Sequence, residues 1–240
     1  MTPRAIPLIA LVTALSAGCN GRSSQSEPAT AAPAATHEAS SGSGHGFPDP
    51  QTYAHHLDDP ARDEWQRPKE VVELLQCSPG MTAVDLGAGT GYFIGYLSEA
   101  VGAGGRVLAL DTERSMIDLM ETRIEQEQLR NVRPYIVAPD DPALAARSVD
   151  RILIVNTWHH ISERVAYAEK LLAALRPGGL LLIVDLTMES PVGPPAHKRL
   201  THDTVVHELE AAGFAAQLVE ELLPYQYVVA GRVLQADQIN

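Results

Sequence analysis

A glycine-rich segment has the residue types and spacing of a ligand-binding loop. Gly87, Gly89 and Gly91 follow a short apolar run and stand just before a helical pattern. Glycine lets the backbone turn tightly and lets a ligand lie close to it. A dinucleotide-binding loop has the spacing G-x-G-x-x-G, which would require a third glycine where Tyr92 stands. The observed spacing is G-x-G-x-G, with Asp85 two residues before the first glycine, and this argues against a dinucleotide.

Polar residues also follow two further apolar runs. Asp111 ends the run 106–110, where a carboxylate can accept hydrogen bonds from both hydroxyls of a ribose or can cap the next helix. Ligands of an open α/β sheet bind outside the carboxyl ends of the strands, so the segment after the run 150–155 is also placed at the site. Asn156, His159 and His160 are therefore candidate catalytic residues. Either histidine could take a proton from an acceptor, or could only shape the pocket.

The elements that must position these residues alternate between strands and helices from about residue 51. Continuous apolar runs predict strands over 83–86, 106–110, 134–138, 150–155 and 180–184. Such runs are typical of a parallel sheet that is covered on both faces. The last two runs, 216–222 and 225–233, are separated by too few residues for a crossover helix and must be antiparallel. The fold class is therefore α/β: a single-domain, Rossmann-like, doubly wound and mostly parallel seven-stranded sheet that ends in an antiparallel hairpin.

Helical periodicity fills the intervals between the strands. Helices are expected from Pro68, around residues 93–101, around 116–124, around 165–175 and over 204–212. Thr112 and Ser162 are expected to cap the third and fourth of these helices. The sequence Pro177-Gly178-Gly179 is expected to end the fourth helix.

The segment 84–93 resembles motif I of the class I S-adenosylmethionine-dependent methyltransferases. The resemblance implies that the loop binds the amino-acid end of S-adenosylmethionine, that an acid after the second strand binds the ribose, and that an acid after the third strand contacts the adenine amine. For Asp140 and Asp141 a solvated turn is the alternative. The residues assigned to the cofactor in this way are Asp85, Gly87, Ala88, Gly89, Gly91, Asp111, Asp140 and Asp141. The segment 175–179 resembles the late motif L-x-P-G-G of the same family, which is structural.

The resemblance covers roughly residues 65–235 and is closest to the ubiquinone/menaquinone-type and arsenite-type enzymes. The arsenite enzymes need several cysteines, and this chain has two, so that substrate is disfavoured. Cys77, the only cysteine of the predicted domain, is expected to be a core residue. Trp65, His197 and Tyr225 lie in segments similar to a bacterial subgroup of uncharacterised methyltransferases. They could line an acceptor pocket or pack the core.

The first 50 residues are not expected to belong to the fold. Residues 1–18 have the short apolar stretch of a secretory signal, and the sequence before Cys19 resembles a bacterial lipobox, which implies that this cysteine is lipidated. Residues 19–50 are rich in Ser, Ala, Gly and Pro and predict a flexible tether, which leaves 51–240 as the methyltransferase domain. The resemblance to a lipoprotein implies a lipid-anchored location in the cell envelope. By resemblance to the Gram-negative sorting rule, in which an Asp after the cysteine indicates inner-membrane retention, Asn20 implies the periplasmic face of the outer membrane if the source is Gram-negative.

The composition narrows the function further. The net charge is −12, with no run of three Lys or Arg residues, which argues against nucleic-acid binding. The spacing of the nine histidines matches no common zinc motif, so no metal is expected. The predicted function is methyl transfer from S-adenosylmethionine to a small-molecule acceptor. The alternatives are a membrane-tethered binding module that keeps the fold, and a nicotinamide oxidoreductase, which Tyr92 disfavours.

Overall fold

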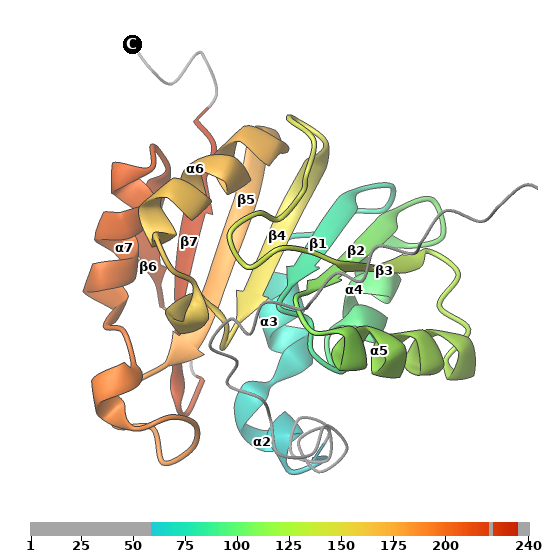
Figure 1. Ribbon diagram of the computed structural model, residues 1–240, viewed down its shortest axis with the longest axis horizontal. Coiled ribbons are helices and arrows are strands. Elements are labelled where there is room, and N and C mark those ends of the chain that lie inside the picture. The colour runs from blue at the N-terminus through green and yellow to red at the C-terminus, as the bar shows by residue number, and fades with distance from the viewer. Residues whose placement is uncertain (1–58, 221–222, 235–240) are drawn as a thin grey trace, which may run out of the picture. The chain divides into compact units, whose positions relative to one another are not determined.

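The computed structural model describes residues 59–220 and 223–234 and contains one seven-stranded sheet (Figure 1). The strand order is β3-β2-β1-β4-β5-β7-β6. The strands are β1 Thr82–Leu86, β2 Arg106–Asp111, β3 Val132–Ile136, β4 Val149–Val155, β5 Leu175–Leu186, β6 Ala215–Val219 and β7 Gln226–Arg232. Strands β1 to β5 are parallel, and β7 is antiparallel to both β5 and β6. The predicted fold class, including its terminal antiparallel pair, is confirmed, whereas Cys19 and the boundaries predicted at residues 18 and 50 lie outside the described residues.

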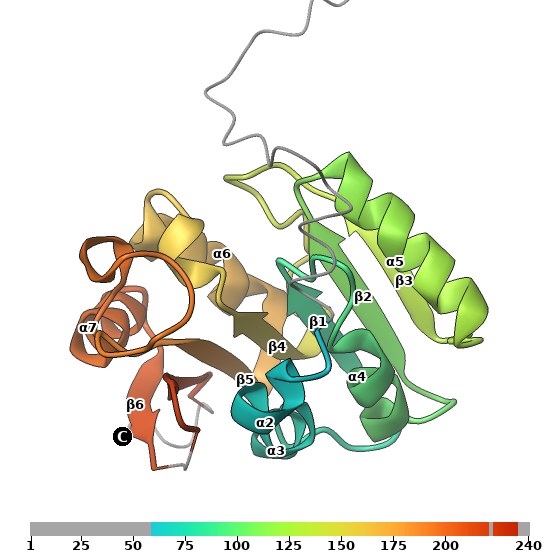
Figure 2. The same cartoon turned by 90° about the horizontal axis from the view of Figure 1, so that it is seen from below.

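Helices cover both faces of the sheet and divide the core in two. They are α2 Arg62–Gln66, α3 Pro68–Leu74, α4 Ile94–Val101, α5 Arg114–Gln126, α6 Arg164–Ala174 and α7 His202–Ala211, with short 3₁₀ turns η1 Trp158–His160 and η2 Ala196–Lys198. One apolar cluster joins α3, α4 and α5 to the sheet, and a second joins α6 and α7 to it. Figure 2 shows α6 on the opposite side of the sheet from α3 and α4. No helix in the described part of the chain is both long enough and apolar enough to span a bilayer.

Both predicted helix caps are wrong. Helix α5 begins after Glu113, and Thr112 makes no cap, because Asp111 Oδ1 already accepts the Glu113 N–H at 2.9 Å. Helix α6 begins after Glu163, whose φ of 48° places the change of direction one residue beyond Ser162. In both cases the hydroxyl residue stands near the helix start, and neighbouring backbone geometry decides where the helix begins.

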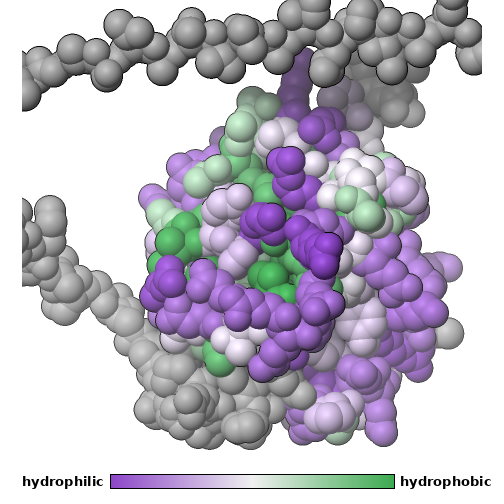
Figure 3. Space-filling model, turned by 90° about the vertical axis from the view of Figure 1, so that its right-hand side faces the viewer, coloured by the Kyte–Doolittle hydropathy of each residue, from purple (hydrophilic) through white to green (hydrophobic). Residues whose placement is uncertain are grey.

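Two predicted boundaries also shift. Helix α6 ends at Ala174, and the Pro-Gly-Gly segment lies inside β5, where Gly178 has a φ of 76° and the pairing with β4 changes register. Strand β3 begins two residues earlier than predicted, because Val132 already pairs with Val107 of β2. Pro134 is tolerated there because β3 is an edge strand. The same edge exposes about half of Tyr135 and Ile136, and Figure 3, which faces α5 and β3, shows a mostly hydrophilic surface around a small apolar area.

Candidate active site

The glycine loop lies at the carboxyl end of β1, between that strand and α4. Gly87, Gly89 and Gly91 have φ angles of 75°, 56° and 82°. A Cβ added at Gly87 would lie 2.3 Å from Thr157 Oγ1, and one added at Gly91 would lie 2.7 Å from Ile94 Cδ1. Backbone conformation therefore favours glycine at residues 87 and 91, and at residue 87 the contact with Thr157 leaves no space for a side chain.

The amides of this loop are already used within the protein. The N–H groups of Gly87 and Ala88 donate to the Leu110 carbonyl oxygen at 2.8 and 3.0 Å. The Gly89 N–H donates to Asp111 Oδ2 at 2.8 Å. Each of these three amides therefore has an acceptor within the protein, and the prediction that the loop binds the cofactor stays a prediction. Because its three glycines have no side chains, the loop leaves its backbone open to direct contact with a ligand.

Asp111 is placed as predicted at the end of β2 and is 9% exposed. Each of its carboxylate oxygens accepts one backbone N–H, from Gly89 and from Glu113. Because a carboxylate has about four acceptor positions, Asp111 can hold the loop and still accept further hydrogen bonds. The two roles foreseen for it, ribose binding and satisfying the amide at the next helix start, are thus compatible.

Asp85 is the buried acid of this end of the sheet. It lies in β1, is 2% exposed, and its Oδ2 has no hydrogen-bond partner in the described part of the chain. Burial and, to a smaller extent, the negative charge of Asp111 raise the pKa of Asp85 to about 7, against the opposing effect of the positive charge of Arg62. An orphaned carboxylate oxygen is costly. The position therefore fits a ligand group that donates hydrogen bonds or carries positive charge.

Asn156 follows β4 and belongs to a network of buried side-chain amides. Its Oδ1 accepts from Gln226 Nε2 at 2.8 Å, and Gln66 Nε2 donates to Gln226 Oε1. Gln66 Oε1 in turn accepts from Arg62 Nε and Nη2, both at 3.2 Å. Gln66 and Gln226 are 0% and 2% exposed. The predicted catalytic Asn156 is thus held by the network, which fixes the backbone at the end of β4.

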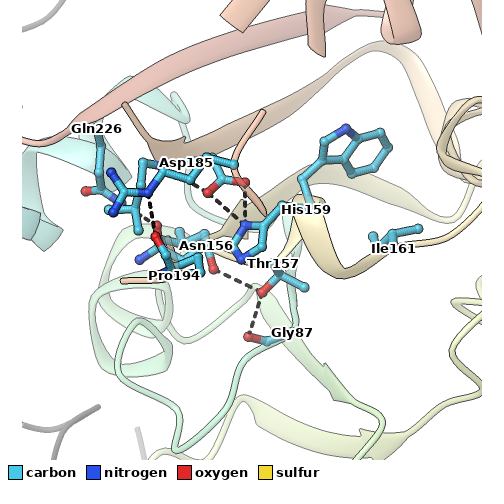
Figure 4. A network of polar contacts seen from close by, with 12 residues as sticks. Gly87, Asn156, Thr157, His159, Ile161, Asp185, Pro194 and Gln226 are labelled. Atoms are coloured by element: carbon cyan, nitrogen blue, oxygen red, sulfur yellow. Dashed lines mark hydrogen bonds and ion pairs between the residues drawn. The ribbon is translucent and has the colours of Figure 1, made fainter. Parts of the chain in front are cut away.

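The two predicted histidines differ in their surroundings. His159 is 4% exposed at its side chain, and its Nδ1 lies 3.0 and 2.9 Å from the two carboxylate oxygens of Asp185, at the end of β5. Its Nε2 is buried without a hydrogen-bond partner in the described residues. Figure 4 shows the imidazole between Asp185 and the Asn156–Thr157 segment. His160 stacks on it at 4.1 Å between ring centroids but is exposed.

Helix α2 lies at the same end of the sheet as the glycine loop (Figure 2). The Arg62 guanidinium carbon lies 4.1 Å from the ring centroid of Tyr92, and the Tyr92 hydroxyl donates a hydrogen bond to Asp63. The rings of Trp65 and Tyr225 lie 6.2 Å apart. The structure therefore places Trp65 beside Tyr225, an arrangement that either lining an acceptor pocket or packing could produce, and the two alternatives stay open.

The remaining candidates lie on the surface. His197 is exposed in η2, and Asp140 and Asp141 are exposed in the turn after β3. Asp141 Oδ1 accepts the Ala143 N–H, and the Asp140 carbonyl accepts from Lys170 Nζ, as in a solvated turn. Among residues 59–220 and 223–234, no three His, Cys, Asp or Glu side chains are grouped as metal ligands would be.

Three residues of this site were missed in the sequence: Asp185, Gln66 and Gln226. A signal existed for Asp185, since it is an acid near the end of an apolar strand, like Asp85 and Asp111. Gln66 and Gln226 are 160 residues apart, and no local pattern pairs two glutamines over that distance.

Comparisons with known proteins agree with this geometry. The family described as "Methyltransferase domain" matches residues 83–179. The crystal structure of a SAM-dependent methyltransferase from Aquifex aeolicus is similar, with a TM-score of 0.72 and 30% identity, covering 78% of this chain and 99% of that chain. The chain therefore belongs to the S-adenosylmethionine-dependent methyltransferases, and its cofactor is S-adenosylmethionine.

Curated relatives are more distant. The ubiquinone/menaquinone biosynthesis C-methyltransferase UbiE of Shewanella frigidimarina is 27% identical over 124 residues, which are 51% of this chain and 49% of that protein. The demethylmenaquinone methyltransferase of Oceanobacillus iheyensis is 23% identical over 125 residues, 52% of each chain. The chain thus spans about half the length of these curated relatives.

The residues present fit this cofactor. S-adenosylmethionine carries an ammonium group, for which the orphaned Asp85 oxygen is a suitable partner. It also carries ribose hydroxyls, for which Asp111 retains acceptor positions. The glycine positions leave room that a Cβ would fill.

Proposed function

We propose that this chain catalyses methyl transfer from S-adenosylmethionine to a small-molecule acceptor. The observation that carries the proposal is the arrangement at one end of the sheet, where the buried Asp85, the glycine loop and Asp111 adjoin the polar segment Asn156–His160. The names of the two curated relatives, which concern ubiquinone and menaquinone biosynthesis, favour a small-molecule acceptor.

In this proposal the residues after β1 and β2 and the residues after β4 and β5 have different tasks. Asp85 and Asp111 hold the cofactor by its ammonium and ribose groups. When bound, the cofactor supplies a methyl group that is already activated by the positive sulfonium. The protein therefore mainly aligns donor and acceptor, an effect that can lower the barrier by about 7–11 kcal/mol. The segment 156–160, fixed by the amide network and by Asp185, forms the wall at which the acceptor is aligned.

Calorimetric titration of S-adenosylmethionine into the full chain tests the cofactor site. Asp111→Ala should weaken binding about 10- to 100-fold, since a hydrogen bond to a charged group contributes about 1.5–3 kcal/mol. Asp203→Ala is the matched control, because this aspartate is exposed on α7 and 78% of its side chain is accessible. Equal affinities in the two variants would contradict the assignment of Asp111, and absence of binding to the folded wild-type chain would refute the proposed function.

We also propose that the domain is attached to a membrane through a lipidated Cys19. The support is the lipobox-like sequence before this cysteine and the Ser-, Ala- and Gly-rich segment after it. Intact mass measurement of the chain from a bacterial host should show an added diacylglyceryl or triacyl group that Cys19→Ser abolishes. A full-length wild-type chain with an unmodified Cys19 in the membrane-free fraction would contradict this proposal.

A further inference from the structure

His159 and Asp185 form a buried pair whose geometry suits proton transfer. Asp185 is 2% exposed, and its two oxygens lie 3.0 and 2.9 Å from His159 Nδ1. A carboxylate at this distance favours the proton on Nδ1, so that Nε2 keeps its lone pair. Nε2 is buried and has no hydrogen-bond partner in the described part of the chain. A polar atom that is buried without a partner is costly, so it indicates a group that is satisfied only when a ligand is bound.

The pair is supported by rigid elements on both sides. Trp158 is fully buried and its Nε1–H donates to Glu208 Oε2 at 2.9 Å, while Arg164 binds the same carboxylate. These contacts fix the 3₁₀ turn that carries His159. Asp185 is held in β5, where its Oδ1 also accepts the Leu186 N–H at 2.8 Å. A histidine held on such elements has a defined orientation before any ligand arrives.

The residues that surround the pair come from several elements of the fold. The groups facing the pair are His160 from η1, Tyr227 from β7, and beyond it the pair Glu208–Arg164 from α7 and α6. Burial raises the pKa of Tyr227 above its usual range, so this residue stays neutral. Asp185 is the anion in direct contact and stabilises the imidazolium that forms when Nε2 takes a proton.

We propose that His159, oriented by Asp185, is the general base of the reaction and that the acceptor is therefore a hydroxyl compound, a phenol, enol or alcohol. The inference rests on the proposed function. A carboxylate needs no base, a thiol ionises readily by itself, and a neutral amine attacks without prior loss of a proton. A phenol or enol methylated at carbon, as the name of the UbiE relative describes, would also lose its hydroxyl proton to a base, so label found on carbon instead of oxygen in the product would overturn the ether assignment. As the new O–CH₃ bond forms and the S–CH₃ bond breaks, the hydroxyl proton passes to His159 Nε2. The products are a methyl ether, a neutral thioether and an imidazolium, which then releases its proton to water.

The first test measures the imidazole itself, without turnover. Nitrogen NMR of ¹⁵N-histidine-labelled full chain, with His159→Gln to assign the signal, should show His159 at neutral pH with a protonated Nδ1 and a bare Nε2. Asp185→Asn should change this tautomer or weaken its preference. A doubly protonated ring, or a proton on Nε2, would overturn the assignment of a base.

The second test measures the acceptor class. The full chain is incubated with S-adenosylmethionine labelled in its methyl group and with a panel of phenols, enols, alcohols, thiols, amines and carboxylates. Label should enter hydroxyl compounds only, and His159→Gln should lower the rate about 10²- to 10⁴-fold, the usual contribution of general-base catalysis. His207→Gln is the matched control because that histidine is exposed on α7.

The outcomes separate this inference from the proposed function. Calorimetric binding of S-adenosylmethionine should be unchanged in His159→Gln. If the cofactor binds but no hydroxyl compound is labelled, the hydroxyl assignment is refuted. If His159→Gln labels a hydroxyl compound as fast as the wild-type chain, the assignment of His159 as the base is refuted. In both cases the methyltransferase proposal stands. If the cofactor does not bind to the folded wild-type chain, the proposed function itself fails.

Discussion

Replacement of Gly87 by alanine should destabilise the fold and weaken cofactor binding together. The position has a φ of 75°, and the new Cβ would lie 2.3 Å from Thr157 Oγ1, 2.4 Å from its Cγ2 and 2.8 Å from its Cβ. The left-handed backbone costs a non-glycine residue about 1–2 kcal/mol. Overpacking a tight contact costs about 1–3 kcal/mol more. Gly87→Ala should therefore lower the free energy of unfolding by about 2–5 kcal/mol.

Gly80→Ala separates the two contributions. Gly80 has a φ of 91°, but a Cβ there meets no atom within 4 Å, so only the backbone term applies. Urea unfolding should show a loss of about 1–2 kcal/mol for this variant. Thr157→Ala should relieve part of the Gly87→Ala loss, since it removes two of the three colliding atoms. If Gly87→Ala costs no more than Gly80→Ala, or if Thr157→Ala gives no relief, the packing argument is wrong.

Three further perturbations test other parts of the site. Because the pKa of Asp85 is raised to about 7 in the folded chain, the unfolded chain releases this proton near pH 4 and the folded chain near pH 7. The free energy of unfolding should therefore fall as the pH rises from about 4 to about 7. Asp85→Asn should remove this pH dependence, as measured by urea unfolding at a series of pH values. Arg199 donates to five backbone carbonyls of the loop after β5, so Arg199→Lys should expose that loop to limited proteolysis. The global free energy of unfolding should change by no more than about 1 kcal/mol. Gln66→Leu leaves Gln226 without its buried donor and should lower the free energy of unfolding, measured with urea, by about 1–3 kcal/mol. The double change Gln66→Leu and Gln226→Leu should lower it by less than the sum of the two single changes.

The fold was predictable from the sequence because its signals are local. The run from Ile152 to Val155 is fully apolar, which is typical of a strand buried on both faces of a parallel sheet, and all four residues are buried. The glycine spacing likewise specifies a loop, since the conformations at Gly87 and Gly91 exclude other residues. The cap predictions for Thr112 and Ser162 failed because helix starts depend on competing acceptors and on single backbone angles.

The chemistry at the acceptor end was only partly predictable. The position of His159 after β4 marked it as a candidate, but nothing nearby in the sequence separates it from His160. Asp185 makes that distinction, and it is 26 residues away. The amide network depends in the same way on contacts between α2 and β7, since Gln66 meets Gln226 only in the folded chain. Such pairs arise from the strand order, which brings β4, β5 and β7 together.

The strand order also explains why the glycine loop after β1 and the segment after β4 are mechanically coupled. The residues proposed to bind the cofactor come from β1 and β2, and those proposed to align the acceptor come from β4 and β5, with β1 and β4 adjacent in the sheet. Thr157 is the point of contact: its hydroxyl donates to the Val155 carbonyl at 3.0 Å, and its side chain fills the space beside Gly87. A shift of the segment after β4 therefore presses directly on the glycine loop. In-line methyl transfer depends on alignment within fractions of an ångström. Thr157→Ala should therefore lower the turnover number more than it lowers the affinity for the cofactor. Comparison of kcat with the calorimetric affinity of this variant would show the difference.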